Sequence, residues 1–160
     1  MNTTQQSNTT TTETSAAAGI AAKLEVTTLP VADVDRAKAF YLSLGWRLDI
    51  DFKPGPDIRG VQFTPPGSPA SIHFGEGLTT ATPGSAQSMI LVVEDLDAAR
   101  DDLIGRGVDV SEVWHLDLEE GVAPGPDPEN RPYANRASFE DPDGNQWHLQ
   151  EVTERLPGRV

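Results

Sequence analysis

The chain has 160 residues, a formal net charge of −13 and no cysteine. The lack of cysteine excludes disulfides, thiol nucleophiles and cysteine-type zinc sites, and agrees with a location in the reducing cytoplasm. The acidic balance argues against nucleic acid or an anionic membrane as a partner, because both attract basic surfaces. No stretch approaches the roughly 20 apolar residues of a membrane span.

Residues 1–22 form an N-terminal tail of mainly Thr, Ser, Gln, Asn and Ala, with almost no bulky apolar side chain. Such a segment buries too little surface to offset its ordering entropy, so we expect it to be disordered. No Lys or Arg precedes the short alanine-rich run of residues 16–22, which argues against a secretion signal. The folded domain is then expected over residues 23–153, and residues 154–160 form a C-terminal tail.

The domain contains an internal repeat. Residues 24–33 alternate like a strand and end at an aspartate that can cap the helix of residues 34–44, which a glycine stops. The same order of strand, capping aspartate, helix and glycine recurs over residues 87–107. One offset, 62 positions, joins five matching pairs: Val31 and Val93, Asp33 and Asp95, Asp35 and Asp97, Ala37 and Ala99, and Gly45 and Gly107. A single offset over some 20 residues indicates a duplication.

Each copy continues with further strands. The first copy has strand patterns at residues 46–52, 59–64 and 70–74, and the second has one at residues 108–115. The second copy then closes with a hairpin over residues 137–152, whose turn, Asp141 to Gly144, is Asp-Pro-Asp-Gly.

The closing hairpins make His73 and His148 equivalent residues of the two copies. Their offset has grown to 75, which places an insertion of about 13 residues within residues 116–132. This segment is rich in Gly and Pro, so we expect it to lack regular structure. A lid over a site and simple surface variation are both open interpretations of it.

Two tandem β-α-β-β-β modules resemble the vicinal-oxygen-chelate (VOC) superfamily of glyoxalase I, extradiol dioxygenases and bleomycin- and fosfomycin-resistance proteins. The motifs that carry the resemblance are residues 29–33 leading to 39–41, residues 91–96, and residues 141–145. The resemblance implies an α+β domain whose modules, about 24–75 and 87–152, form a U-shaped cup. It also implies a homodimer, because single-domain members often pair to complete or cover the cup. One scaffold hosts many chemistries, so the fold alone does not give the activity.

In metal-dependent members of this superfamily, ligands come from the first and the last strand of each module. The matching positions here are Val26 and Ser88 on the first strands and His73 and His148 on the last strands. Valine cannot ligate, serine is a poor ligand, and a catalytic zinc or iron site usually takes three protein ligands. We therefore expect no cofactor. Bound zinc, iron or manganese, held by the two histidines, is the alternative.

The candidate site is a pocket for a small organic molecule. Strand parity places Gln150 on the same face as His148, and His115 lies at the mouth of the insertion. Trp147 has the opposite parity, so it should face the helix layer. The expected ligand-binding residues are Val26, His73, Ser88, His115, His148 and Gln150.

Two functions stay open. The first is a metal-free small-molecule-binding protein of the glyoxalase and bleomycin-resistance type. The second is an enzyme, a lyase, isomerase or dioxygenase, in which His73 and His148 act as metal ligands or as acid and base. An imidazole with a pKa near 6.5 suits proton transfer at neutral pH. Arg59 and Arg136 could hold an anionic substrate or be solvated charges, and Trp114 could stack on an aromatic ligand or belong to the core.

Overall fold

The computed structural model describes residues 19–159, so the disorder expected of residues 1–18 lies outside the described part of the chain. The first module consists of β1 (Val26–Thr28), α1 (Val34–Ser43), β2 (Arg47–Phe52), β3 (Arg59–Thr64) and β4 (Ser71–Glu76). The second module consists of β5 (Met89–Val93), α2 (Leu96–Gly105), β6 (Trp114–Asp117), β7 (Gly121–Pro124), β8 (Asn135–Glu140) and β9 (Gln146–Glu151). Neither described helix is long and apolar enough to cross a membrane.

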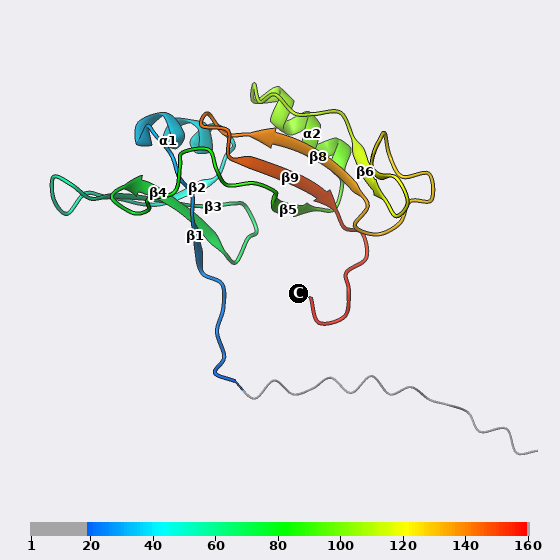
Figure 1. The fold of residues 1–160 in the computed structure, drawn as a ribbon, viewed down its shortest axis with the longest axis horizontal. Helices are drawn as coiled ribbons and strands as arrows, with labels where there is room; N and C mark the ends of the chain where they lie inside the picture. The colour runs from blue at the N-terminus through cyan, green and yellow to red at the C-terminus, as the bar shows by residue number, and fades with distance from the viewer. Residues whose placement is uncertain (1–18, 160) are drawn as a thin grey trace, which may run out of the picture.

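Each module builds its own sheet, and the two sheets lie beside each other with the helices on one side (Figure 1). The first sheet has the strand order β1-β4-β3-β2, and the second has the order β5-β9-β8-β6-β7. In both sheets the first strand of the module pairs in parallel with the last strand, and the other pairs are antiparallel. The α+β fold of two tandem modules is therefore confirmed.

The expected capping of both helices is also confirmed. The side chain of Asp33 accepts a hydrogen bond from the backbone N–H of Arg36 at 2.9 Å, and that of Asp95 accepts from Ala98 at the same distance. These bonds satisfy backbone donors that have no partner inside a helix, which is why aspartate is favoured at this position. The repeat read from the sequence is thus a repeat of local structure.

The prediction that the inserted segment lacks regular structure, made from its Gly and Pro content, is wrong. Its residues 121–124 form β7, which pairs with β6 in antiparallel register. The carboxylate of Asp117 accepts hydrogen bonds from the backbone N–H groups of Glu119 and Glu120, at 2.8 and 2.9 Å, and so shapes the turn between the strands. Because β7 is an edge strand, Pro124 costs it no hydrogen bond on its open side.

One hydrophobic core serves both modules. Tyr41 of α1 is fully buried and contacts the rings of Trp46, Phe63 and Phe74 in its own module, with centroids 5.1 to 6.0 Å apart. Trp147 of β9 reaches into the same cluster, 5.3 Å from the ring of Trp46 and 6.4 Å from that of Tyr41. The expectation that Trp147 faces the helix layer is confirmed, and the modules are joined by aromatic packing.

Removal of the Tyr41 hydroxyl is expected to weaken this junction. The hydroxyl donates to Oδ2 of Asp141 at 3.0 Å and accepts from Nε1 of Trp147 at 3.1 Å. Burial and the nearby Asp141 raise the pKa of Tyr41, so the hydroxyl stays neutral. Tyr41→Phe leaves the indole N–H buried without a partner, and we expect the free energy of unfolding in urea to fall by about 1–3 kcal/mol.

Tyr133→Phe is the matched control for Tyr41→Phe, because the Tyr133 hydroxyl only accepts a hydrogen bond from the exposed backbone at Leu156. Its effect should stay within about 0.5 kcal/mol. Equal losses in the two variants would contradict a structural role for the buried hydroxyl of Tyr41.

Candidate functional site

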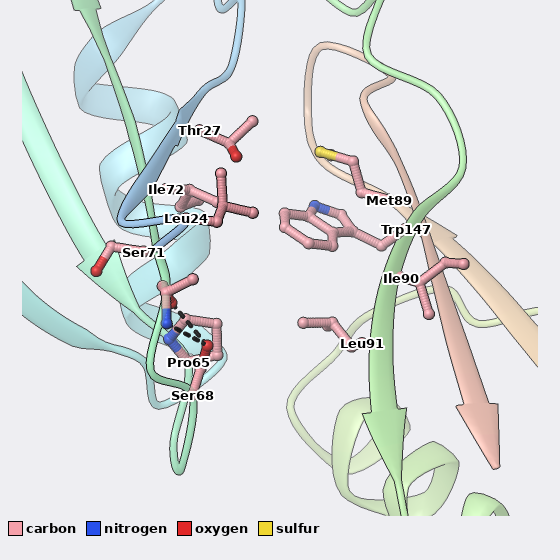
Figure 2. Close-up of a pocket in the computed structure, with 11 residues that line it drawn as sticks. Leu24, Thr27, Pro65, Ser68, Ser71, Ile72, Met89, Ile90, Leu91 and Trp147 are labelled. Atoms are coloured by element: carbon pink, nitrogen blue, oxygen red, sulfur yellow. Dashed lines mark hydrogen bonds between the residues drawn. The ribbon is translucent and has the colours of Figure 1, made fainter. Parts of the chain in front are cut away.

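A pocket of about 270 Å³ lies at the seam between the two modules (Figure 2). In Figure 2 the side chains of Leu24, Thr27 and Ile72 approach it from the first module, and those of Met89 and Trp147 approach it from the second. All of its lining residues are apolar or carry an uncharged hydroxyl. This seam pocket can accept an apolar group, but it offers no side chain for acid–base catalysis or for holding a metal.

The chemistry-bearing side chains lie elsewhere, on the face of each sheet that is turned away from the shared core, here called the outer face. In β4, Ile72 and Phe74 enter the core, so alternation places His73 on the outer face. In β9, Trp147 and Leu149 enter the core, so His148 lies on the outer face of the second sheet.

The outer face of the second sheet holds a polar and aromatic cluster around His148. The ring of His148 meets the ring of Trp114 edge to face, with centroids 5.2 Å apart. Nη1 of Arg136 lies 3.2 Å from Nδ1 of His148, and Oε1 of Gln146 lies 3.2 Å from Nε2. We call the four side chains of His148, Trp114, Arg136 and Gln146 the His148 cluster.

The hydrogen bonds of the His148 cluster fix the protonation of His148. A guanidinium can only donate, so Nδ1 of His148 accepts the bond from Arg136. The proton therefore sits on Nε2 and is donated to Gln146. Burial and the charge of Arg136 both lower the pKa of His148, so the ring is neutral at pH 7. Both ring nitrogens are engaged.

Apolar side chains surround the His148 cluster on the same outer face. Ile90 and Val92 lie in register with His148 and Gln150, and Leu116 lies in register with Val122. The four apolar side chains are 39% to 68% exposed, which is unusual for large apolar groups on the face of a sheet. A few polar groups within an apolar surround are typical of sites that bind organic ligands.

The outer face of the first sheet is simpler. Nε2 of His73 forms a hydrogen bond with the hydroxyl of Thr28, its register partner on β1. Val26 is half-buried and lies in register with Ser71 on the same face. At the far edge of this face, Ile50 and Phe52 of β2 are at least half exposed. This face offers a histidine, an apolar surface, and the carboxylate of Asp49, which accepts a hydrogen bond from Gln62, the register partner of His73 on β3.

Residues 23–149 match the family model of the glyoxalase/bleomycin resistance protein/dioxygenase superfamily. The chain belongs to this superfamily. Among solved structures it is 32% identical to TnmS3, described as an antibiotic binding protein from Streptomyces sp. CB03234, with a TM-score of 0.64 over 82% of this chain and 97% of that one. A member of the superfamily from Sphaerobacter thermophilus is 28% identical, with a TM-score of 0.63 over 82% of this chain and 98% of that one. No curated protein shows significant similarity to this chain.

The residues expected to form the superfamily site are only partly brought together. His148 and Gln150 share the outer face of the second sheet, and Ser88 lies one residue before β5 with a φ of 56°. His115 alternates with Trp114 along β6 and so has the opposite parity; it is buried, and its Nδ1 donates to the carbonyl of Gly125 at 2.7 Å. It therefore does not join the His148 cluster.

His73 and His148 are not in contact within the described chain. No hydrogen bond or ring contact joins them, and neither lines any of five cavities found among residues 19–159. Within that range we find no group of three or more His, Asp or Glu side chains placed to hold a metal ion. A paired acid and base would need both histidines to face a common ligand.

The expected ligand-binding set lacks three members of the His148 cluster: Trp114, Arg136 and Gln146. Strand pairing puts Trp114 opposite Arg136, and Arg136 opposite Gln150. The sequence of the closing hairpin alone could have placed Arg136 on the same face as His148, because the register of an antiparallel pair determines which residues of its two strands share a face. Trp114 could not be placed, since the insertion hides the register of β6.

Proposed function

We propose that this protein binds a small organic molecule, without a metal, on the outer face of its second sheet. The observation that carries this proposal is the His148 cluster within a surround of exposed apolar side chains. The 32% identity to an antibiotic binding protein supports the same class of function. Neutral His148 and the indole of Trp114 give the site planar groups that suit an aromatic or conjugated ligand.

Neutral aromatic ligands provide the direct test. We expect the fluorescent compound N-phenylnaphthylamine to bind the wild-type chain, and Trp114→Ala to weaken that binding about tenfold, as for removal of an anchor residue. Thr27→Trp, which fills the seam pocket, should leave the affinity within about twofold. The reverse pattern would move the ligand to the seam pocket, and no binding to the wild-type chain would contradict the proposal.

The donor set supports a metal-free site. Both nitrogens of His148 are engaged by hydrogen bonds, and the metal-ligand position of the first β-strand is occupied by Val26. A dication would meet the positive charge of Arg136 beside His148 and no anion in that cluster, so the loss of its water shell would be poorly compensated.

We therefore expect the purified protein to carry well under one equivalent of metal. A tightly bound native-state ligand raises the melting temperature by mass action. EDTA should then leave the melting temperature unchanged, as measured by differential scanning fluorimetry. Near-stoichiometric zinc, iron or manganese by elemental analysis, lost in His148→Ala, would contradict a metal-free site and support the metal enzymes of the superfamily.

A homodimer would complete the binding site. In one chain the outer face of the second sheet exposes Ile90, Val92 and Leu116, and the outer face of the first sheet exposes Ile50 and Phe52. A second copy that sets its first sheet over the second sheet of its partner would cover both apolar surfaces. Light scattering at micromolar concentration should give twice the 17.2 kDa of one chain. We propose that this dimer is cytoplasmic, because a chain without cysteine has no disulfide that would need an oxidising compartment.

A further inference from the structure

Arg136 differs from the six arginines that precede it in the chain, because it has no carboxylate partner. Each of the six arginines that precede it forms an ion pair with an aspartate or a glutamate: Arg36, Arg47, Arg59, Arg100, Arg106 and Arg131. Among residues 19–159 no Asp or Glu oxygen lies within ion-pair distance of Arg136. In a chain with a net charge of −13, an unpaired guanidinium inside the candidate site is an exception.

The guanidinium of Arg136 is held in place by neutral groups. Its Cζ lies 5.8 Å from the centre of the Trp114 ring, within the range of a cation–π contact. Its Nη1 donates to neutral His148 at 3.2 Å. These contacts orient the planar head, but none of them cancels its charge.

The free edge of this guanidinium is the edge that binds oxyanions. Nε of Arg136 is buried and has no hydrogen-bond partner, and Nη2 donates to no described residue. Arginine grips carboxylates and related anions by two parallel N–H groups, and the Nε and Nη2 pair forms such a fork. A buried donor without a partner is unfavourable in the free protein, so a ligand that pairs with it gains that interaction on binding.

We propose that Arg136 recognises an anionic group, a carboxylate, a sulfonate or an ionised hydroxyl, on the organic molecule that this site binds. The inference rests on the proposed function and adds the charge of the ligand. The apolar surround of Ile90, Val92 and Leu116 takes the rest of the molecule, and the negative protein leaves Arg136 as the local attraction for an anion. Arg59, in contrast, is saturated by Asp35 and Asp51 and cannot serve in this way.

Two fluorescent probes that share one aromatic skeleton test the inference. Anilinonaphthalene sulfonate carries a sulfonate, and N-phenylnaphthylamine lacks it. Fluorescence titration should show that the wild-type chain binds the sulfonate at least about tenfold more tightly, and that Arg136→Met removes this preference. The neutral probe lacks the group that pairs with Arg136, so its affinity should fall less in Arg136→Met than the affinity for the sulfonate. The control is Arg47→Met, which removes a side chain that is 73% exposed and lies in the other module, and it should change neither affinity.

A second measurement on the wild-type chain does not depend on the variants. In ¹H–¹⁵N spectra that resolve arginine Nε–H groups, the signal assigned to Arg136 should shift when the sulfonate is added and stay unmoved with the neutral probe. Equal loss of both probes in Arg136→Met, or an unmoved Nε signal while the sulfonate binds, would overturn the inference and leave the proposed function standing. Failure of both probes to bind the wild-type chain would overturn both.

Discussion

Replacing Asn145 by alanine is expected to lower the free energy of unfolding by about 3 kcal/mol or more, because several buried hydrogen bonds are lost together. Asn145 is fully buried at the end of the turn between β8 and β9. Its Nδ2 donates to the carbonyl of Pro30 at 2.9 Å and to Oδ2 of Asp141 at 2.8 Å, and its Oδ1 accepts from the N–H of Ala86 at 3.1 Å.

These bonds tie three parts of the chain together. Pro30 follows β1 of the first module, Ala86 precedes β5, and Asp141 opens the last turn. Alanine at position 145 would leave the carbonyl of Pro30 and the N–H of Ala86 without these partners inside the protein. The cost should therefore appear in global unfolding rather than in local fraying of one module.

Urea unfolding followed by tryptophan fluorescence measures this loss. Gln87→Ala is the matched control, because this exposed amide lies close to the same junction and reaches only backbone carbonyls at 3.1 to 3.5 Å. Its effect should stay within about 0.5 kcal/mol. A similar small effect in Asn145→Ala would show that the turn contributes little to the connection between the modules.

Gly84→Ala should be comparably damaging, with an expected loss of about 3 kcal/mol or more. Gly84 has a φ of +79°, and its N–H donates to the carbonyl of Pro30 at 3.1 Å. A Cβ atom at this position would stand 2.0 Å from the carbonyl oxygen of Asp143. That oxygen belongs to the backbone of the last turn, so it cannot move aside without disturbing the bonds of Asn145.

Gly67→Ala separates the close approach from the backbone conformation. Gly67 has a φ of +75°, yet a Cβ there would have no neighbour within 4 Å. It should therefore show only the strain of a left-handed alanine, about 1–2 kcal/mol. The difference between the two variants then measures the contact of the Gly84 segment with the last turn, and equal losses would mean that this contact is unimportant.

Local signals in the sequence were enough to predict the repeated part of the fold. Capping aspartates, the glycines that end the helices and the alternation of the strands all act within a few residues, so they can be read without knowing the fold. Asp33 and Asp95 cap the helices as predicted, and Trp147 faces the core as its parity predicts. The strand β7 was missed because its stability comes from pairing with β6 and not from its own Gly-rich and Pro-containing sequence.

The candidate site was harder to predict, because its properties depend on contacts between distant residues. Strand parity placed His148 and Gln150 on one face, but it could not show that Arg136 occupies Nδ1 of His148. It also could not show that Arg136 lacks a carboxylate, since the sequence around it is rich in acidic residues. Only the three-dimensional arrangement tells which charges are paired. The expectation that the ligand has an anionic group depends on this distinction.

Native mass spectrometry of the full chain tests the central claim most directly, because one spectrum reports chain number, metal and bound organic molecule together. The sample would be treated with a chelator, which is then removed, and mixed with excess anilinonaphthalene sulfonate. We expect a species of twice 17.2 kDa that carries the probe and no metal. A chain that stays at 17.2 kDa without the probe, or that takes up the probe only after zinc, iron or manganese is added, would contradict a metal-free binding protein built from two copies.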